Sequence, residues 1–232
     1  MTVRVAIIDS GINPDHPHVG GVNDGVFFHA EGRSADYTDR IGHGTAVAGA
    51  IREKAPGADL YAVRIFDRRL TATLGTLMQG LEWCLAHGVH IVNVSVGTAN
   101  QQHRARLDDF VRRARRQEVF VVSAAGMLPG MLTGAIAVDV DPECDRDVCR
   151  FHDGVFLASP YPRPIPGVPP ERNLKGVSFA IANYTGLLAR ALGSRSPVDA
   201  YDEVLQAAKA SAQSTNRKPP EGAVQDLRKR DP

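Results

Sequence analysis

Short runs of apolar and β-branched residues recur along the chain, separated by longer amphipathic stretches. The runs are almost entirely apolar, which is typical of strands that are buried on both faces of a sheet. They predict five strands, at residues 3–8, 58–66, 90–96, 119–125 and 135–140. Helical patterns lie between them, at residues 44–54, 73–87 and 101–117. This alternation predicts right-handed βαβ units and an α/β fold built on a parallel sheet.

The pattern changes after residue 140. Residues 141–175 contain seven prolines and predict an irregular surface segment with one short strand at residues 155–158. Two more helices are predicted, at residues 177–192 and 197–212, the second with a proline in its first turn. The remaining residues are polar, charged and proline-containing. We therefore expect one domain over residues 1–212 and a flexible tail over residues 213–232.

Composition and charge argue against several classes of partner. The chain has 27 basic and 26 acidic residues, so a net charge of +1 gives no global field that would attract nucleic acid or an anionic membrane. Acidic residues interrupt the arginine-rich helix at residues 101–117, which favours a solvated face over a nucleic-acid patch. The apolar runs are shorter than the roughly 20 residues of a membrane-spanning helix. No apolar signal core opens the chain, so we expect a cytoplasmic protein.

The three cysteines are too few for a disulfide framework, which suits a reducing compartment. Cys144 and Cys149 are spaced so that they could pair or share a metal ion. No further Cys or His pair at metal-ligand spacing accompanies them, so two free thiols in a loop are the simpler interpretation. We expect neither a metal nor a cofactor.

Three polar residues stand where strands or loops give way to helices. Asp9 ends the first strand, His43 opens a helix in the motif GHGT, and Ser178 opens a later helix in GVSFA. The crevice at the carboxyl ends of parallel strands is where an α/β fold binds ligands. Taken singly, each residue has an ordinary interpretation as a turn aspartate, a surface histidine or a capping serine. Together they could form a nucleophile, a base and an orienting carboxylate, and the helix dipole should favour a neutral imidazole at His43.

The segments that carry these residues resemble the subtilisin-like serine peptidases. VRVAIIDSGINPDHP is similar to the aspartate segment of that family, IGHGTAVAGAI to its histidine helix, and ADLYAVRIF with LMQGLEWCLAHGVHIVNVSVG to its core. GVSFAIANYTGLLA is a looser match to the nucleophile segment. The resemblance implies a three-layer fold, with a mostly parallel twisted sheet and helices on both faces.

The same resemblance implies the roles of the site residues. Ser178 would attack a peptide carbonyl, His43 would transfer the proton, and Asp9 would orient the imidazole. Residues 95–97 (Ser95, Val96 and Gly97) would pair with the backbone of a peptide or protein substrate, and Ala124, Ala125 and Gly126 would line the first specificity pocket.

The chain departs from the family at Met127, where an asparagine usually donates a hydrogen bond to the oxyanion. A thioether cannot donate one. Asn173 could substitute, although an ordinary loop asparagine is the more economical interpretation.

Two functions therefore stay open: a serine endopeptidase of restricted specificity that processes a precursor peptide, and a silent fold that acts as a peptide-binding scaffold. Transamidation through the same acyl-enzyme is a further option. The chain is short for the family and shows no match to its calcium loops, so we expect it to fold without them or to depend on an activating partner.

Overall fold

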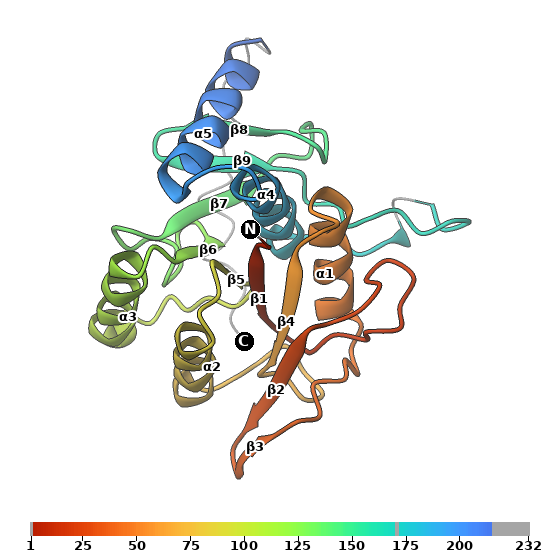
Figure 1. The fold of residues 1–232 in the computed structure, drawn as a ribbon, viewed down its shortest axis with the longest axis vertical. Helices are drawn as coiled ribbons and strands as arrows, with labels where there is room; N and C mark the ends of the chain where they lie inside the picture. The colour runs from red at the N-terminus through yellow and green to blue at the C-terminus, as the bar shows by residue number, and fades with distance from the viewer. Residues whose placement is uncertain (1, 170–171, 215–232) are drawn as a thin grey trace.

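The strands assemble into one twisted sheet in the computed structural model, which describes residues 2–169 and 172–214 (Figure 1). Nine strands lie in the order β3-β2-β4-β1-β5-β6-β7-β9-β8. Their bounds are β1 Arg4–Asp9, β2 Asp24–His29, β3 Gly32–Ser34, β4 Asp59–Arg64, β5 Ile91–Val94, β6 Phe120–Ala124, β7 Ile136–Val140, β8 Cys149–His152 and β9 Val155–Ala158. Neighbouring strands are parallel except at the two edges, where β3 is antiparallel to β2 and β8 is antiparallel to β9.

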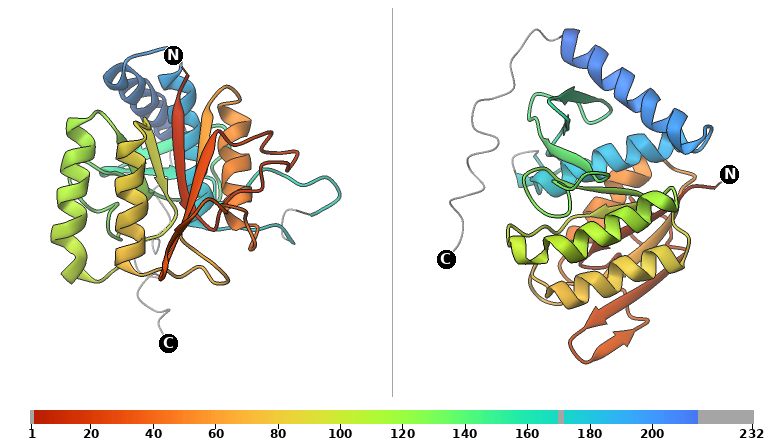
Figure 2. Two further views of the ribbon diagram at one scale, coloured as in Figure 1. Left: turned by 60° about the horizontal axis from the view of Figure 1, so that its bottom comes forward. Right: turned by 90° about the vertical axis from the view of Figure 1, so that its left-hand side faces the viewer.

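Helices cover both faces of the sheet (Figure 2). One face carries α1 (His43–Lys54), α4 (Val177–Leu192) and α5 (Pro197–Ser214), and the other carries α2 (Leu74–Ala86) and α3 (Arg104–Arg116), which a short 3₁₀ helix, Gln101–His103, precedes. The three-layer α/β fold expected from the sequence is thereby confirmed. The proposed tail begins within α5, and residues 215–232 lie outside the described part of the chain.

The central strand explains why the apolar runs lack alternation. Val5 and Ile7 of β1 point into the core beneath α1 and α4, whereas Ala6 and Ile8 point into the core beneath α2 and α3. Each of the four is buried. A strand with a core on both faces needs apolar residues at every position.

Two edge elements differ from the sequence-based expectation. The hairpin of β2 and β3 was not predicted, because β2 has a run of only three apolar residues, at 26–28, and β3 has none. Strand β8 was assigned to the irregular segment, yet it pairs with β9 through a turn at Asp153 and Gly154, both at positive φ. An Asp-Gly pair between apolar runs is a strong hairpin signal that the interpretation overlooked. Cys149 therefore lies in a strand and not in a loop.

The arginine-rich helix packs as an amphipathic surface element. Leu107, Phe110 and Val111 of α3 are fully buried. On its outer side, Arg113 forms ion pairs with Glu82 and Asp109. No helix among the described residues is long and apolar enough to cross a membrane.

Candidate active site

Asp9 lies at the carboxyl end of β1 with no exposed surface. The backbone N–H of Ser10 donates a hydrogen bond of 2.7 Å to its Oδ1. Nδ1 of His43 lies 2.8 Å from Oδ1 and 2.9 Å from Oδ2. The buried carboxylate therefore fixes which nitrogen of the imidazole faces it and leaves Nε2 as the nitrogen that can exchange a proton.

His43 begins α1, and the helix approaches β1 very closely at this point. A Cβ built on Gly44 would lie well under 3.0 Å from the carbonyl oxygen of Gly11 and 3.1 Å from Cβ of Asp9. Only glycine permits this approach. The GHGT motif thus places His43 within hydrogen-bonding distance of the strand end.

The pKa of His43 reflects opposing influences. Burial lowers it, whereas the hydrogen bond and charge of Asp9, together with the charge of Asp39, raise it, and the net result is a pKa above the ordinary histidine value. The expected preference for a neutral imidazole is therefore opposed by these two carboxylates. Carboxylates in contact with a ring or close to it outweigh the partial charge of a helix end.

Ser178 lies half-buried in the first turn of α4. Helix α4 packs against α1, and the ring of the adjacent Phe179 contacts the ring of His43 with centroids 5.4 Å apart. Among the described residues, His43 is hydrogen-bonded to Asp9 and no hydrogen bond joins it to Ser178. The structure thus joins Asp9 to His43 and places Ser178 next to a residue that contacts the histidine. Nothing in the sequence indicated the Phe179 contact, because it depends on how two helices distant in the sequence cross.

The segments expected to hold substrate follow two neighbouring strands, β5 and β6. Residues 95–97 continue from β5. Ala124 is the last residue of β6, and Ala125 and Gly126 continue from it. Just beyond them Thr98 and Leu128 form an antiparallel bridge, with N–H to carbonyl distances of 3.0 Å and 2.9 Å. The two predicted segments therefore lie side by side at the carboxyl edge of the sheet.

The chain was compared with protein families to find relatives that share the strand and helix of this site. The model of the subtilase family matches residues 1–131, which include Asp9 and His43 and end before Ser178. The chain belongs to the subtilase family. The match covers the strand and the helix that carry the hydrogen-bonded pair, so the resemblance to this family is confirmed.

Individual relatives extend the comparison. The chain is 37% identical over 134 residues to the thermostable alkaline protease of Halalkalibacterium halodurans, a match that covers 53% of this chain and 35% of the relative. It is 28% identical over 203 residues to subtilisin Savinase of Lederbergia lenta, covering 80% and 71% of the two chains. The chain thus spans about a third of the length of the first relative. The protease domain of PatA, solved as a serine-to-alanine mutant, is similar in fold, with a TM-score of 0.61 at 24% identity over 94% of this chain and 88% of that chain.

Met127 occupies the position where the subtilase resemblance would place an asparagine. The residue is half-buried, and its side chain lies against Gly97. A Cβ built on Gly97 would lie 2.9 Å from Cβ and 3.3 Å from Sδ of Met127. The thioether therefore fills space beside the predicted substrate strand.

Asn173 is held within its own loop. Its Nδ2 donates to the carbonyl oxygen of Arg163 at 3.4 Å, and its Oδ1 accepts from the N–H of Leu174 at 2.8 Å. These contacts agree with an ordinary loop asparagine. They leave no sign of a substitute oxyanion donor at this residue.

The cysteines are all free and buried. Burial raises the pKa of Cys144 to about 11 and that of Cys149 to about 12. Both thiols are therefore protonated at neutral pH and unsuited to nucleophilic attack. Among the described residues, no group of three or more His, Cys, Asp or Glu side chains is placed to hold a metal ion.

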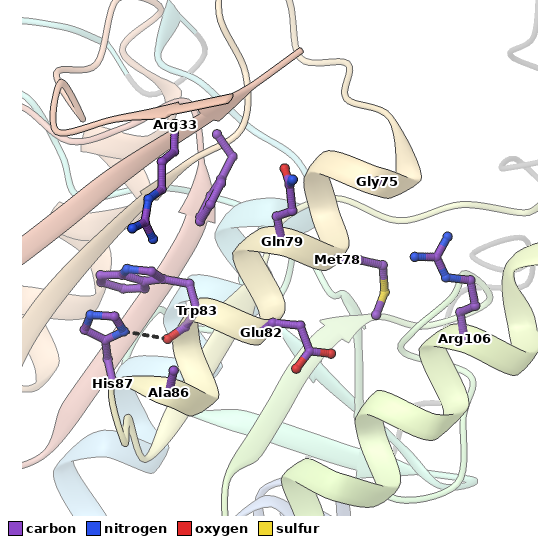
Figure 3. A pocket seen from close by; sticks show the side chains of 10 residues that line it. Arg33, Gly75, Met78, Gln79, Glu82, Trp83, Ala86, His87 and Arg106 are labelled. Atoms are coloured by element: carbon purple, nitrogen blue, oxygen red, sulfur yellow. Dashed lines mark hydrogen bonds between the residues drawn. The ribbon is translucent and has the colours of Figure 1, made fainter. Parts of the chain in front are cut away.

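A separate hollow lies between the β2–β3 hairpin and α2 (Figure 3). Its volume is about 630 Å³, and Trp83 stacks on His87 within it with ring centroids 3.7 Å apart. The Nδ1–H of His87 donates to the carbonyl oxygen of Trp83 at 2.8 Å. Arg33 and Arg106 stand at its rim. None of the predicted site residues lines this hollow.

Proposed function

We propose that this subtilase is a serine endopeptidase that cleaves peptide bonds through an acyl-enzyme on Ser178. The observation that carries the proposal is the hydrogen bond between Nδ1 of His43 and the fully buried carboxylate of Asp9. An imidazole held in this way presents Nε2 for proton transfer.

Ser178 Oγ attacks the substrate carbonyl carbon while His43 takes its proton at Nε2. The tetrahedral intermediate collapses as the same proton passes to the leaving amine and the peptide C–N bond breaks. Water then attacks the acyl-enzyme carbonyl and gives its proton to Nε2 of His43. That proton passes to Ser178 Oγ as the ester bond breaks, and the carboxylic acid leaves. Asp9 stabilises the imidazolium in both half-reactions.

Oxyanion stabilisation is the weakest part of this machinery. The backbone N–H of Ser178 lies in the first turn of α4, where helix N–H groups lack intrahelical partners and the helix dipole favours negative charge. Met127 offers no second donor. Loss of one such donor raises the barrier by about 2.7 to 4 kcal/mol, a figure measured in a subtilisin. We therefore propose slow turnover. The thioether of Met127 also takes up space beside Gly97 of the predicted substrate strand, and on that ground we propose a restricted substrate range, as suits a peptidase that processes a precursor.

A peptide-binding scaffold without catalysis is the second candidate. Two features favour it: the thioether at position 127, and the absence, within the described residues, of a hydrogen bond from the Ser178 hydroxyl to His43. Catalytic hydrogen bonds are often long before substrate binds, so the second feature weighs less than the first.

Covalent labelling decides between the two. The purified chain would be incubated with a fluorophosphonate and its mass measured, beside Ser178→Ala and beside Ser34→Ala, a matched change of an exposed serine in β3. A single adduct on the native chain and on Ser34→Ala, absent from Ser178→Ala, would support the peptidase. No adduct, under conditions in which a known serine peptidase reacts fully, would reject it for the isolated chain and favour the scaffold.

A further inference from the structure

Asp39, in the loop that precedes α1, accepts five hydrogen bonds on one carboxylate. Its Oδ1 accepts from Ser10 Oγ at 2.9 Å and from the backbone N–H groups of Ile41 and Gly42 at 2.9 Å and 2.8 Å. Its Oδ2 accepts from Thr45 at 2.8 Å from the backbone N–H and 2.6 Å from the hydroxyl. A carboxylate with this many charge-assisted hydrogen bonds is fixed in position.

These bonds replace a missing helix cap. Gly42 stands at the N-cap of α1 with φ of 91° and has no side chain that could accept a hydrogen bond. The first N–H groups of a helix require outside acceptors. Asp39 supplies one for Thr45, in the turn that carries His43, and also holds the two residues that lead into that turn.

Ser10 connects this cap to the opposite side of the site. Its hydroxyl donates to Asp39 and accepts from the backbone N–H of Gly44 at 2.9 Å. Its own N–H donates to Oδ1 of Asp9. One network therefore joins the residue after Asp9 to the residue after His43.

We propose that Asp39 is a positioning residue that holds His43 on Asp9 through the start of α1, and that its negative charge stabilises the imidazolium that forms during catalysis. The effect of Asp39 on turnover rests on the proposed peptidase function, whereas its effect on the position and pKa of His43 does not depend on that function. In the described part of the chain, the charged groups acting on His43 are Asp9 from β1 and Asp39 from the loop, and α4 presents the apolar ring of Phe179. The raised pKa of His43 is consistent with both carboxylates acting on it.

Three variants separate the effect of Asp39 on the position of His43 from the effect of its negative charge. Asp39→Asn removes the charge and leaves one oxygen to accept hydrogen bonds, Asp39→Ala removes both, and Ser10→Ala breaks the link to Gly44 while keeping the charge. Asp36→Asn is the matched control, because this exposed carboxylate lies in the same loop but has other partners: it pairs with Arg40 and Arg64 and accepts from the backbone N–H of Thr38. The pKa of His43 would be followed by nitrogen-15 NMR of the histidine side chains, assigned with His43→Gln, and the rate of fluorophosphonate labelling would be measured against pH.

We expect Asp39→Asn to lower the pKa of His43 and to reduce the plateau labelling rate about tenfold or more, because a misplacement near 1 Å costs roughly 100-fold in rate. Asp39→Ala should reduce the labelling rate further than Asp39→Asn does. Ser10→Ala should also reduce the labelling rate, but with a smaller change in the pKa of His43. An unchanged His43 titration in folded Asp39→Asn, or a rate loss no larger than that of Asp36→Asn, would overturn the proposal. A fall in rate with no shift in the pKa would reduce Asp39 to a structural cap and overturn it as well. If the native chain does not label at all, the peptidase proposal fails while the NMR titration still tests Asp39.

Discussion

Replacement of Gly44 by alanine tests whether the close approach of α1 to β1 sets the geometry of the site. The added Cβ would lie well under 3.0 Å from the carbonyl oxygen of Gly11 and 3.2 Å from Oδ1 of Asp9. Both neighbours belong to the strand end and its turn, so the start of the helix must move instead. Ordinary contact begins near 3.4 Å, so the carbonyl oxygen and the added Cβ must separate by roughly 1 Å or more, and a misplacement near 1 Å costs about 100-fold in rate.

The assay is the plateau rate of fluorophosphonate labelling at a pH where His43 is neutral, with folding checked by circular dichroism. Gly57→Ala is the matched control, because a Cβ there would meet nothing within 4 Å. We expect Gly57→Ala to label like the native chain and Gly44→Ala to label about 10 to 100 times more slowly. A folded Gly44→Ala that labels at the native rate would refute the reasoning that this contact places the histidine.

Three further outcomes follow from His43 and Met127. Because Asp9 and Asp39 raise the pKa of His43, labelling should rise with pH and reach half its maximum above about 6.5, the ordinary histidine value; a midpoint below that value would contradict the assignment. The same shift stabilises the fold below the ordinary value and is lost as the pH rises through the raised pKa, so His43→Gln should cost more unfolding free energy, measured with urea, near pH 6 than near pH 9. Met127→Asn restores a hydrogen-bond donor and should speed labelling about tenfold or more, whereas Met127→Leu should not; equal rates for the two would show that position 127 does not face the oxyanion.

The sequence was informative where chemistry and local structure coincide. Asp9 at a strand end and His43 at a helix start are local features, and both were predicted and then found hydrogen-bonded. The parallel sheet followed from runs that are apolar at every position. By contrast, the Asp39 network was missed, although an aspartate shortly before a helix is a known capping signal, because the acceptor stands three residues before a glycine N-cap.

What the sequence could not supply depends on how distant segments meet. The contact between Phe179 and His43 joins residues on α4 and α1, and the position of Met127 against Gly97 joins the ends of two strands. Neither contact leaves a periodic pattern or a spacing. Both arise from shape, which a chain acquires only once its helices and strands have packed.

Met127 bears on both candidate functions, because its side chain concerns both the oxyanion position and the space beside Gly97. If the proposed peptidase function holds, the missing donor would weaken stabilisation of the transition state for every substrate alike, whereas the thioether beside Gly97 would change the space available to a residue bound there. A scaffold would gain from the altered space beside Gly97, and the missing oxyanion donor would not affect it. An enzyme would tolerate the missing donor only if its substrate stayed bound long enough for slow acylation. The Nδ1–H of His43 donates to the buried carboxylate of Asp9, and a buried pair of this kind is often less stabilising than apolar residues of similar volume, so a scaffold has no evident use for it. The Asp9–His43 pair therefore favours the proposed peptidase over the scaffold.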